Sequence, residues 1–130
     1  MVTFVVCFVF FVVFPVAGPR YMEFPTPLPT DRGFFRPLVL WVLERGSSRG
    51  TAFPSSHVAV ALTQSVLAIR YFGPRGAIVA ALSIGLAIGA VYGGFHYFID
   101  VMAGAAIGAV TTYVALRVWR TAHANATAPT

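Results

Sequence analysis

Long apolar runs separated by short polar segments dominate the chain, and each run predicts a helix. The four runs cover residues 2–17, about 56–71, 77–92 and 98–119. A helix satisfies its own backbone hydrogen bonds inside lipid, so apolar runs of this kind are expected to be helical. The first run is a little short for a hydrocarbon core about 30 Å thick at roughly 1.5 Å of rise per residue. We therefore predict an all-α membrane bundle with about four transmembrane helices.

Between the first and second runs the pattern breaks. Residues 18–54 are rich in proline and arginine and are expected to lie outside the hydrocarbon core or at its surface. Within this stretch, residues 34–43 are mostly apolar but too few to span a bilayer. Because Arg36 and Arg45 flank them, we predict a short interfacial helix in the headgroup plane. Residues 46–50 are predicted to form a loop.

Glycines recur at four-residue spacing in the last two runs. The third run carries Gly85, Gly89 and Gly93, and the fourth carries Gly104 and Gly108. Small residues at this spacing lie on one helix face and permit close helix contact. The two faces therefore predict close packing within the bundle, and they also allow a homo-oligomer.

Composition agrees with a membrane location. The 130 residues are 58% hydrophobic and only 10% charged, which leaves too little polar surface to cover a soluble globule. All nine basic residues are arginines, and they lie between the apolar runs, where they are typical of membrane topology and anionic headgroups. No nucleic-acid partner is predicted. Cys7 is the only cysteine, which excludes an intrachain disulfide and a multi-cysteine zinc site.

Counting the runs gives a topology for a multi-pass integral membrane protein. The end of the first run, the start of the second and the turn between the third and fourth fall on one side, so residues near 20, 55 and 96 share a face. Short flanking segments indicate the cytoplasmic side more dependably than long loops. The opposite face receives four arginines in short segments, and we place it in the cytoplasm: Arg70, Arg75, Arg117 and Arg120. The first face is then extracytoplasmic.

His96 and Asp100 are the first candidates for chemistry. They are four residues apart at a helix start, so their side chains lie on one face and can meet. A carboxylate held on one imidazole nitrogen fixes the tautomer and leaves the other nitrogen free as a base or nucleophile. Asp100 is also the only acid in or beside the last three runs, where ionisable residues are costly. The alternative is that the pair only caps the fourth helix.

A second histidine favours a functional site. His57 follows Pro54, Ser55 and Ser56 at the start of the second run, where free backbone amides and the positive helix end can bind an anion. Helix capping would explain the serines but not the histidine. Two histidines, one with a carboxylate partner, share a face with Arg20 and Arg49. Together they provide a nucleophile, an acid and positive groups, which are the parts of a phosphoryl-transfer site.

The segments 51–57 (TAFPSSH) and 93–100 (GGFHYFID) resemble the second and third signature motifs of the type 2 phosphatidic acid phosphatase and vanadium haloperoxidase superfamily. The resemblance implies that His96 attacks phosphorus and forms a phosphohistidine, that Asp100 orients it, and that His57 protonates the leaving oxygen. Ser55 and the amide of Ser56 would bind phosphate oxygens. Neither a metal nor a cofactor would be required.

The chain departs from the family pattern at two positions and in one missing motif. Ser56 stands where the second motif often has glycine, and Ala90 stands where the third motif commonly has an arginine that binds phosphate. The first motif is not recognisable. Arg20, directly after the first run, is the better-placed substitute, and Arg49 is a second candidate that is equally well read as a solvated loop arginine. The FPSSH and HYFID forms are similar to inositol phosphorylceramide synthase-like members.

Family members usually have six spans, and the four here correspond to the last four. We therefore predict one membrane-embedded, phosphatase-like domain over residues 1–120 and a disordered tail at 121–130. The leading function is removal of phosphate from a lipid phosphate or prenyl diphosphate, with that lipid and the surrounding membrane lipids as partners. The alternatives are a phospho-headgroup transferase and a non-catalytic multispan subunit.

Overall fold

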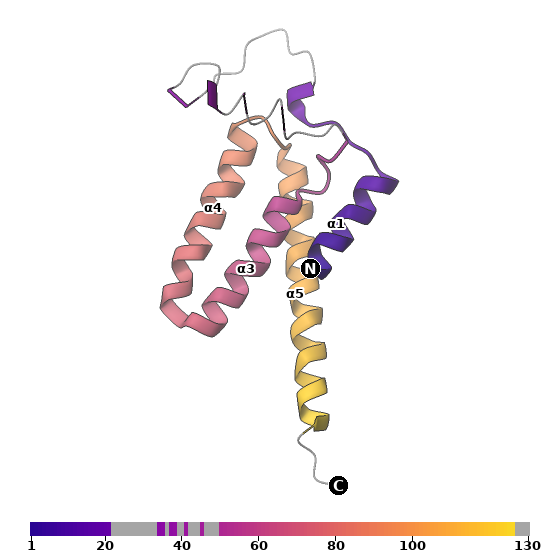
Figure 1. Ribbon diagram of the computed structural model, residues 1–130, viewed down its shortest axis with the longest axis vertical. Helices are drawn as coiled ribbons and strands as arrows, with labels where there is room; N and C mark the ends of the chain where they lie inside the picture. The colour runs from indigo at the N-terminus through magenta and orange to yellow at the C-terminus, as the bar shows by residue number, and fades with distance from the viewer. Residues whose placement is uncertain (22–33, 36, 39–40, 42–44, 46–49, 127–130) are drawn as a thin grey trace.

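The computed structural model describes residues 1–21, 34, 35, 37, 38, 41, 45 and 50–126, and this part of the chain is helical (Figure 1). An isolated bridge between Val16 and Thr51 is its one strand-like pairing. The elements in chain order are α1 (Val2–Val13), η1 (Pro19–Tyr21), α3 (Ser56–Phe72), η3 (Gly73–Gly76), α4 (Ala77–Tyr92) and α5 (Phe98–Ala126).

The helix α3 is the centre of the bundle. It packs against α4 on one side, against α5 on the other, and against α1. The end of α1, the start of α3, the end of α4 and the start of α5 lie at the same end of the bundle, at the top in Figure 1. Backbone hydrogen bonds join these segments: Ala52 N–H donates to Val16 O at 3.1 Å, and Ser55 N–H donates to Asp100 O at 3.0 Å. The prediction that residues near 20, 55 and 96 share one end is confirmed.

Two described segments are long and apolar enough to cross a membrane, namely Ser56–Tyr92 and Phe98–Ala122. The first folds back at η3 and so contains both α3, with 17 residues, and α4, with 16. The apolar helix α1 is shorter, with 12 residues. The predicted order of helices is therefore present, while the number of membrane crossings stays a prediction.

Two predicted helix ends are wrong. The first helix was expected to reach residue 17 but ends at Val13, because Pro15 disfavours a helical conformation at Phe14. The last helix was expected to end near residue 119, yet α5 continues to Ala126. Residues 121–126, predicted to be disordered, are helical, since they include three alanines and no glycine or proline. Half of the predicted interfacial helix at 34–43, and residues 46–49 of the predicted loop, lie outside the described residues.

The two glycine faces behave differently. A Cβ added at Gly104 would overlap the Ser55 carbonyl oxygen, and one added at Gly108 would overlap the Ala59 carbonyl oxygen. The small face of α5 therefore brings the backbones of α3 and α5 together, as predicted. Gly85 and Gly89 of α4 have no atom of the described chain within 4 Å of an added Cβ. Their face contacts no described helix.

Hydroxyl groups join the helices inside the bundle. The Thr3 hydroxyl of α1 lies 3.3 Å from that of Thr63 in α3 and 2.9 Å from that of Thr111 in α5, and Thr112 Oγ1 donates to Thr63 Oγ1 at 3.1 Å. Ser65 in α3 donates to Ser83 in α4 at 2.8 Å. Such contacts replace the water that hydroxyls lack in an apolar interior, and they fix how neighbouring helices are rotated.

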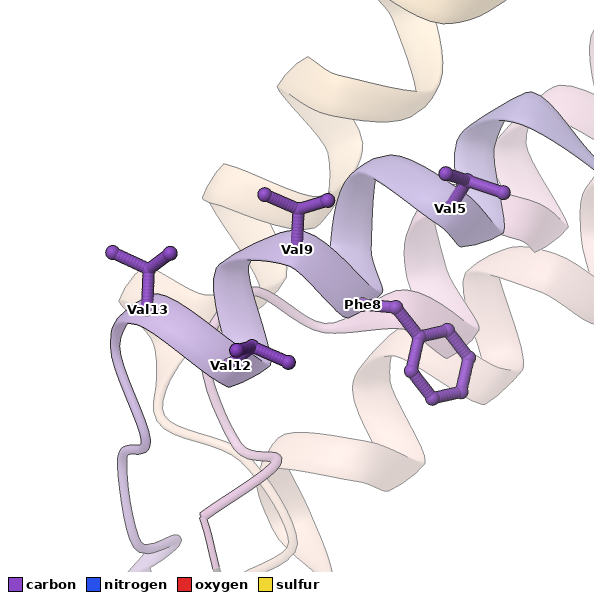
Figure 2. A pocket seen from close by; sticks show the side chains of 5 residues that line it. All are labelled: Val5, Phe8, Val9, Val12 and Val13. Carbon is purple, nitrogen blue, oxygen red and sulfur yellow. The ribbon is translucent and has the colours of Figure 1, made fainter.

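The outer face of α1 carries a wholly apolar hollow. Figure 2 shows its lining side chains: Val5, Phe8, Val9, Val12 and Val13. No polar atom contributes to this surface. A charged group would lose its hydration here without gaining a partner, so the chemistry must be sought at the loop end of the bundle.

Candidate active site

The C-terminal cap of α4 positions the backbone of His96. Phe95 N–H donates to Ala90 O at 3.0 Å and Gly94 N–H donates to Val91 O at 3.1 Å, which is the hydrogen-bond pattern of a Schellman motif. The motif needs a left-handed residue, and Gly94 has a φ of 72°. His96 N–H donates to the same Ala90 oxygen at 3.1 Å. The consecutive glycines of the motif therefore fix the backbone of His96 against the end of α4.

The tautomer of His96 is set by a backbone carbonyl. His96 Nδ1 lies 2.8 Å from Ala52 O. A carbonyl oxygen can only accept, so Nδ1 carries the proton and Nε2 keeps its lone pair. The nearest Asp100 oxygen, Oδ2, is 3.7 Å from Nδ1, which is within ion-pair distance when the ring is protonated but too long for a hydrogen bond. Nδ1 therefore donates its hydrogen bond to Ala52 O, and the Asp100 carboxylate lies farther from the same nitrogen.

Asp100 also caps α5. Its side chain is almost completely buried, and Oδ2 accepts from Tyr97 N–H at 2.7 Å, which is one half of a capping box. Its backbone carbonyl accepts from Ser55 N–H. The two interpretations of the sequence, helix capping and contact with His96, are therefore both present in one residue.

The serines and His57 begin α3. Ser55 is fully buried and is the N-cap, with Oγ accepting from Val58 N–H at 3.5 Å, whereas His57 is exposed. The His57 and His96 ring centroids are 6.3 Å apart. Within the described part of the chain, the amides of Ser56 and His57 have no hydrogen-bond partner, as expected for a first helical turn. These amides, more than the Ser55 hydroxyl, are placed to bind an anion.

The protonation of His96 follows from its surroundings. Burial lowers the pKa of His96 below its ordinary value of 6.5, and the neighbouring His57 adds to this effect. The Ala52 carbonyl and the Asp100 carboxylate raise the pKa but do not offset the burial. His96 is therefore neutral at neutral pH, which a nitrogen nucleophile requires.

The predicted phosphate-binding arginines are only partly placed. Arg20 lies in η1 at the site end of the bundle, but its side chain is not among those described, and Arg49 lies outside the described residues. Ala90, at the family's arginine position, contributes its carbonyl to the cap that holds His96. In the described ranges no group of three or more His, Cys, Asp or Glu side chains is placed to hold a metal ion.

Two residues that help to build the candidate active site were not predicted from the sequence. Ala52 acts through its backbone carbonyl, and Gly18 packs against the backbone that precedes His96. Neither residue has a reactive side chain. A backbone contact between segments this far apart leaves no signal in one sequence.

The fold and the site define a class: an apolar helical bundle with two histidines and a helix start with free amides at one end. The chain belongs to the PAP2 superfamily, because the family model with that description matches residues 1–114. The resemblance seen in the two motifs is thereby confirmed. No match was found among curated proteins or among solved structures. Membership supports a phosphoesterase of the phosphatase type.

Proposed function

We propose that this protein is a membrane-embedded phosphoesterase that removes phosphate from a lipid phosphate or a prenyl diphosphate through a phosphohistidine at His96. The observation that carries the proposal is the 2.8 Å contact between His96 Nδ1 and Ala52 O. It leaves the Nε2 lone pair available beside the His57 ring, which is 6.3 Å away. One phosphate group can contact both rings at this separation.

In the first step, His96 Nε2 attacks phosphorus. The N–P bond forms, the P–O bond to the lipid breaks, and protonated His57 gives its proton to the departing oxygen. The positive charge that develops on the His96 ring is balanced by the Asp100 carboxylate, 3.7 Å from Nδ1. The products are the lipid alcohol, or the prenyl monophosphate, and phosphohistidine.

In the second step, water replaces His96. Neutral His57 accepts a proton from the water as its oxygen bonds to phosphorus, and the N–P bond breaks to restore the Nε2 lone pair. Inorganic phosphate leaves and His57 is protonated for the next cycle. The equatorial phosphate oxygens are bound by the amides of Ser56 and His57 at the start of α3. Arg20 and Arg49 are the proposed cations, since both follow or precede segments of the site.

The membrane arrangement is part of the proposal. We place four crossings, with α3 and α4 as a hairpin, and the site on the extracytoplasmic face, because the arginines in short flanks lie at the other end. A substrate whose tail stays in the bilayer would present its phosphate at that surface. The apolar outer face of α1 is then in contact with lipid.

Phosphate release tests this function. The purified full-length protein would be assayed in detergent with phosphatidic acid and with a prenyl diphosphate, beside His96→Ala, His57→Ala and the matched control His123→Ala. We expect His96→Ala to lose roughly 10⁴-fold or more of the rate, and His123→Ala to keep it. Radiolabelled substrate should leave acid-labile label on wild type but not on His96→Ala. Equal rates for wild type and His96→Ala would reject the proposal.

A phosphotransferase is the second candidate, favoured by the FPSSH and HYFID forms of the two motifs. An alcohol would then replace water in the second step, and His57 would take the alcohol's proton. The transferase would release phosphate slowly but would label an added inositol or other alcohol. If no labelled product forms with any acceptor while phosphate is released, the hydrolase is retained.

A further inference from the structure

We propose that the segment directly after α1, and Gly18 in particular, is a positioning element for the nucleophile. Gly18 sets the separation between the two motif segments whose contact orients His96. The inference rests on the proposed function of His96, but its geometry is independent of any substrate. Gly18 touches neither the substrate nor a reacting atom, and acts through Ala52 and Phe95.

Ala52 is held on both sides of its Cα. Its N–H donates to Val16 O at 3.1 Å, and its C=O accepts from His96 Nδ1 at 2.8 Å. The residue is buried, with 6% of its surface exposed. The segment after α1 therefore fixes the residue that fixes the tautomer of His96.

Gly18 closes the same junction from the other side. A Cβ at Gly18 would lie 2.7 Å from the Phe95 carbonyl oxygen and 3.6 Å from Ala52 Cβ. Phe95 immediately precedes His96, and its carbonyl belongs to the peptide bond that the two residues share. Gly18 thus lies between the backbone that carries the imidazole and the residue whose carbonyl accepts the hydrogen bond from Nδ1. An added methyl group would overlap the Phe95 carbonyl oxygen, so the junction between Gly18 and Phe95 must shift.

A third contact connects α1 with this junction. The Phe10 ring packs edge-on against Phe53, with ring centroids 6.4 Å apart, and Phe53 follows Ala52. Gly18 is buried, and so is Pro19 after it. Phe10 of α1, and Val16 and Gly18 in the segment after it, therefore all meet the second motif. The segment after α1 has no reactive side chain, yet it is held by these contacts against the segments that carry His57 and His96.

The first test compares Gly18→Ala with Gly85→Ala, which adds the same methyl group where no described atom lies within 4 Å. We expect Gly18→Ala to lower kcat by about 10- to 100-fold, because displacements near 1 Å have effects of that size. KM should change less than about twofold, since the amides of Ser56 and His57 still bind phosphate. Gly85→Ala should keep both constants. A wild-type kcat for folded Gly18→Ala overturns the inference.

The second test needs no activity. Nitrogen NMR of ¹⁵N-histidine-labelled protein, with His96 assigned by comparison with His96→Ala, reports which ring nitrogen carries the proton. Wild type and Gly85→Ala should show protonated Nδ1, while Gly18→Ala should show a mixture of tautomers. This result would stand even if no tested lipid were a substrate. If the enzyme is active but Gly18→Ala leaves the His96 tautomer unchanged, the inference about Gly18 is overturned while the proposed function is retained.

A second variant covers the case in which Gly18→Ala does not fold. Ala52→Gly keeps the backbone N–H and C=O but removes the Cβ nearest to Gly18, so it loosens the same junction without adding an atom. It should lower kcat by about threefold to tenfold and broaden the His96 signal, again with little change in KM. The double variant Gly18→Ala with Ala52→Gly should recover part of the kcat lost by Gly18→Ala. A wild-type kcat and tautomer in Ala52→Gly would overturn the inference.

Discussion

The helices α4 and α5 carry the same glycine spacing but use it differently. In α5, Gly104 and Gly108 lie against the carbonyls of Ser55 and Ala59, so the two backbones touch. In α4, Gly85 and Gly89 face open space within the described chain, and no residue of α4 is buried. Four-residue spacing therefore predicts which face of a helix can be approached closely, but it does not predict what approaches.

The difference has a consequence for the site. The contact at Gly104 holds Ser55, the residue that caps α3 and bonds to the Asp100 carbonyl. The glycine face of α5 thus helps to fix the position of the start of α3. Among the described residues, the glycine face of α4 makes no comparable contact, and α4 reaches the site through its C-terminal cap.

The largest predicted effect is that of Gly104→Val compared with Gly85→Val. At Gly104 the added atoms overlap the Ser55 backbone, and we expect a loss of about 3 kcal/mol or more in the free energy of unfolding. A displaced α3 start should also lower phosphate release by about 100-fold. Gly85→Val should cost well under 1 kcal/mol. Both values come from denaturant unfolding and the phosphatase assay in detergent.

An equal loss in Gly85→Val would contradict this comparison. It would mean that α4 packs against a partner, and a second copy of the chain is then the first candidate. Size-exclusion chromatography of wild type and Gly89→Leu would distinguish the cases, because leucine would separate such a pair. If Gly89→Leu abolishes assembly while His57→Ala and His96→Ala leave function untouched, the non-catalytic subunit is the better interpretation.

The second prediction concerns the end of α4. Gly94 has a φ of 72°, and Gly94→Ala places a Cβ in a left-handed conformation at a cost of about 1–2 kcal/mol. Because His96 follows in the same cap, kcat should fall by about tenfold. Gly89→Ala is the control, since it adds the same methyl group within the helix and into open space. A fall in stability without a fall in kcat would show that the cap does not hold His96.

The sequence predicted much of the fold because apolar helices depend on local features. The lengths of the apolar runs predicted the bounds of α3 and α4 to within one residue. The order of the runs predicted that both motifs lie at one end of the bundle. The last helix was predicted too short, since Trp119 indicates an interfacial end there, and a residue typical of a membrane edge need not end a helix. The packing of α4 was not predictable, because a glycine face looks the same with or without a neighbour.

The candidate site was predicted only where side chains carry the chemistry. His57, His96 and Asp100 were found from residue type and spacing, and the structure brings them to one end of the bundle. Ala52 and Gly18 were missed because their contributions are a carbonyl and an absent side chain. Ser55 was expected to bind phosphate, but its buried hydroxyl caps α3, a role that the same sequence pattern equally allows.

The third prediction tests how α1, which has no glycine, is held. The Thr63 hydroxyl contacts Thr3 and Thr112, so Thr63→Val removes hydrogen bonds to α1 and α5 at nearly constant volume. We expect a loss of about 1 kcal/mol in unfolding free energy, as for other hydrogen bonds between membrane helices. Thr121→Val is the control, because the Thr121 hydroxyl bonds only within α5, to Arg117 O and Val118 O. Equal losses would show that the threonine cluster does not dock α1.

The smallest predicted effect is the pH dependence that follows from charge near His96. Charge is a second difference between α4 and α5. Helix α5 carries Asp100 in its first turn, whereas α4 has no charged residue. Burial lowers the pKa of His96 below its ordinary value of 6.5, so the folded state favours the neutral ring. This contribution to stability is complete above pH 6.5 and is lost as the pH falls through the lower pKa of the folded state. Phosphate release should fall over the same range, because protonated Nε2 cannot attack.

Asp100→Asn tests the origin of this shift. The carboxylate raises the pKa of His96, so its removal should move both the NMR titration of His96 and the acid limb of kcat/KM to lower pH. The asparagine oxygen can still accept from Tyr97 N–H and keep the cap of α5. His57→Gln should move the NMR titration the other way, because the His57 charge lowers the pKa of His96. If both variants shifted the titration in the same direction, a change in burial would explain it better than these two charges.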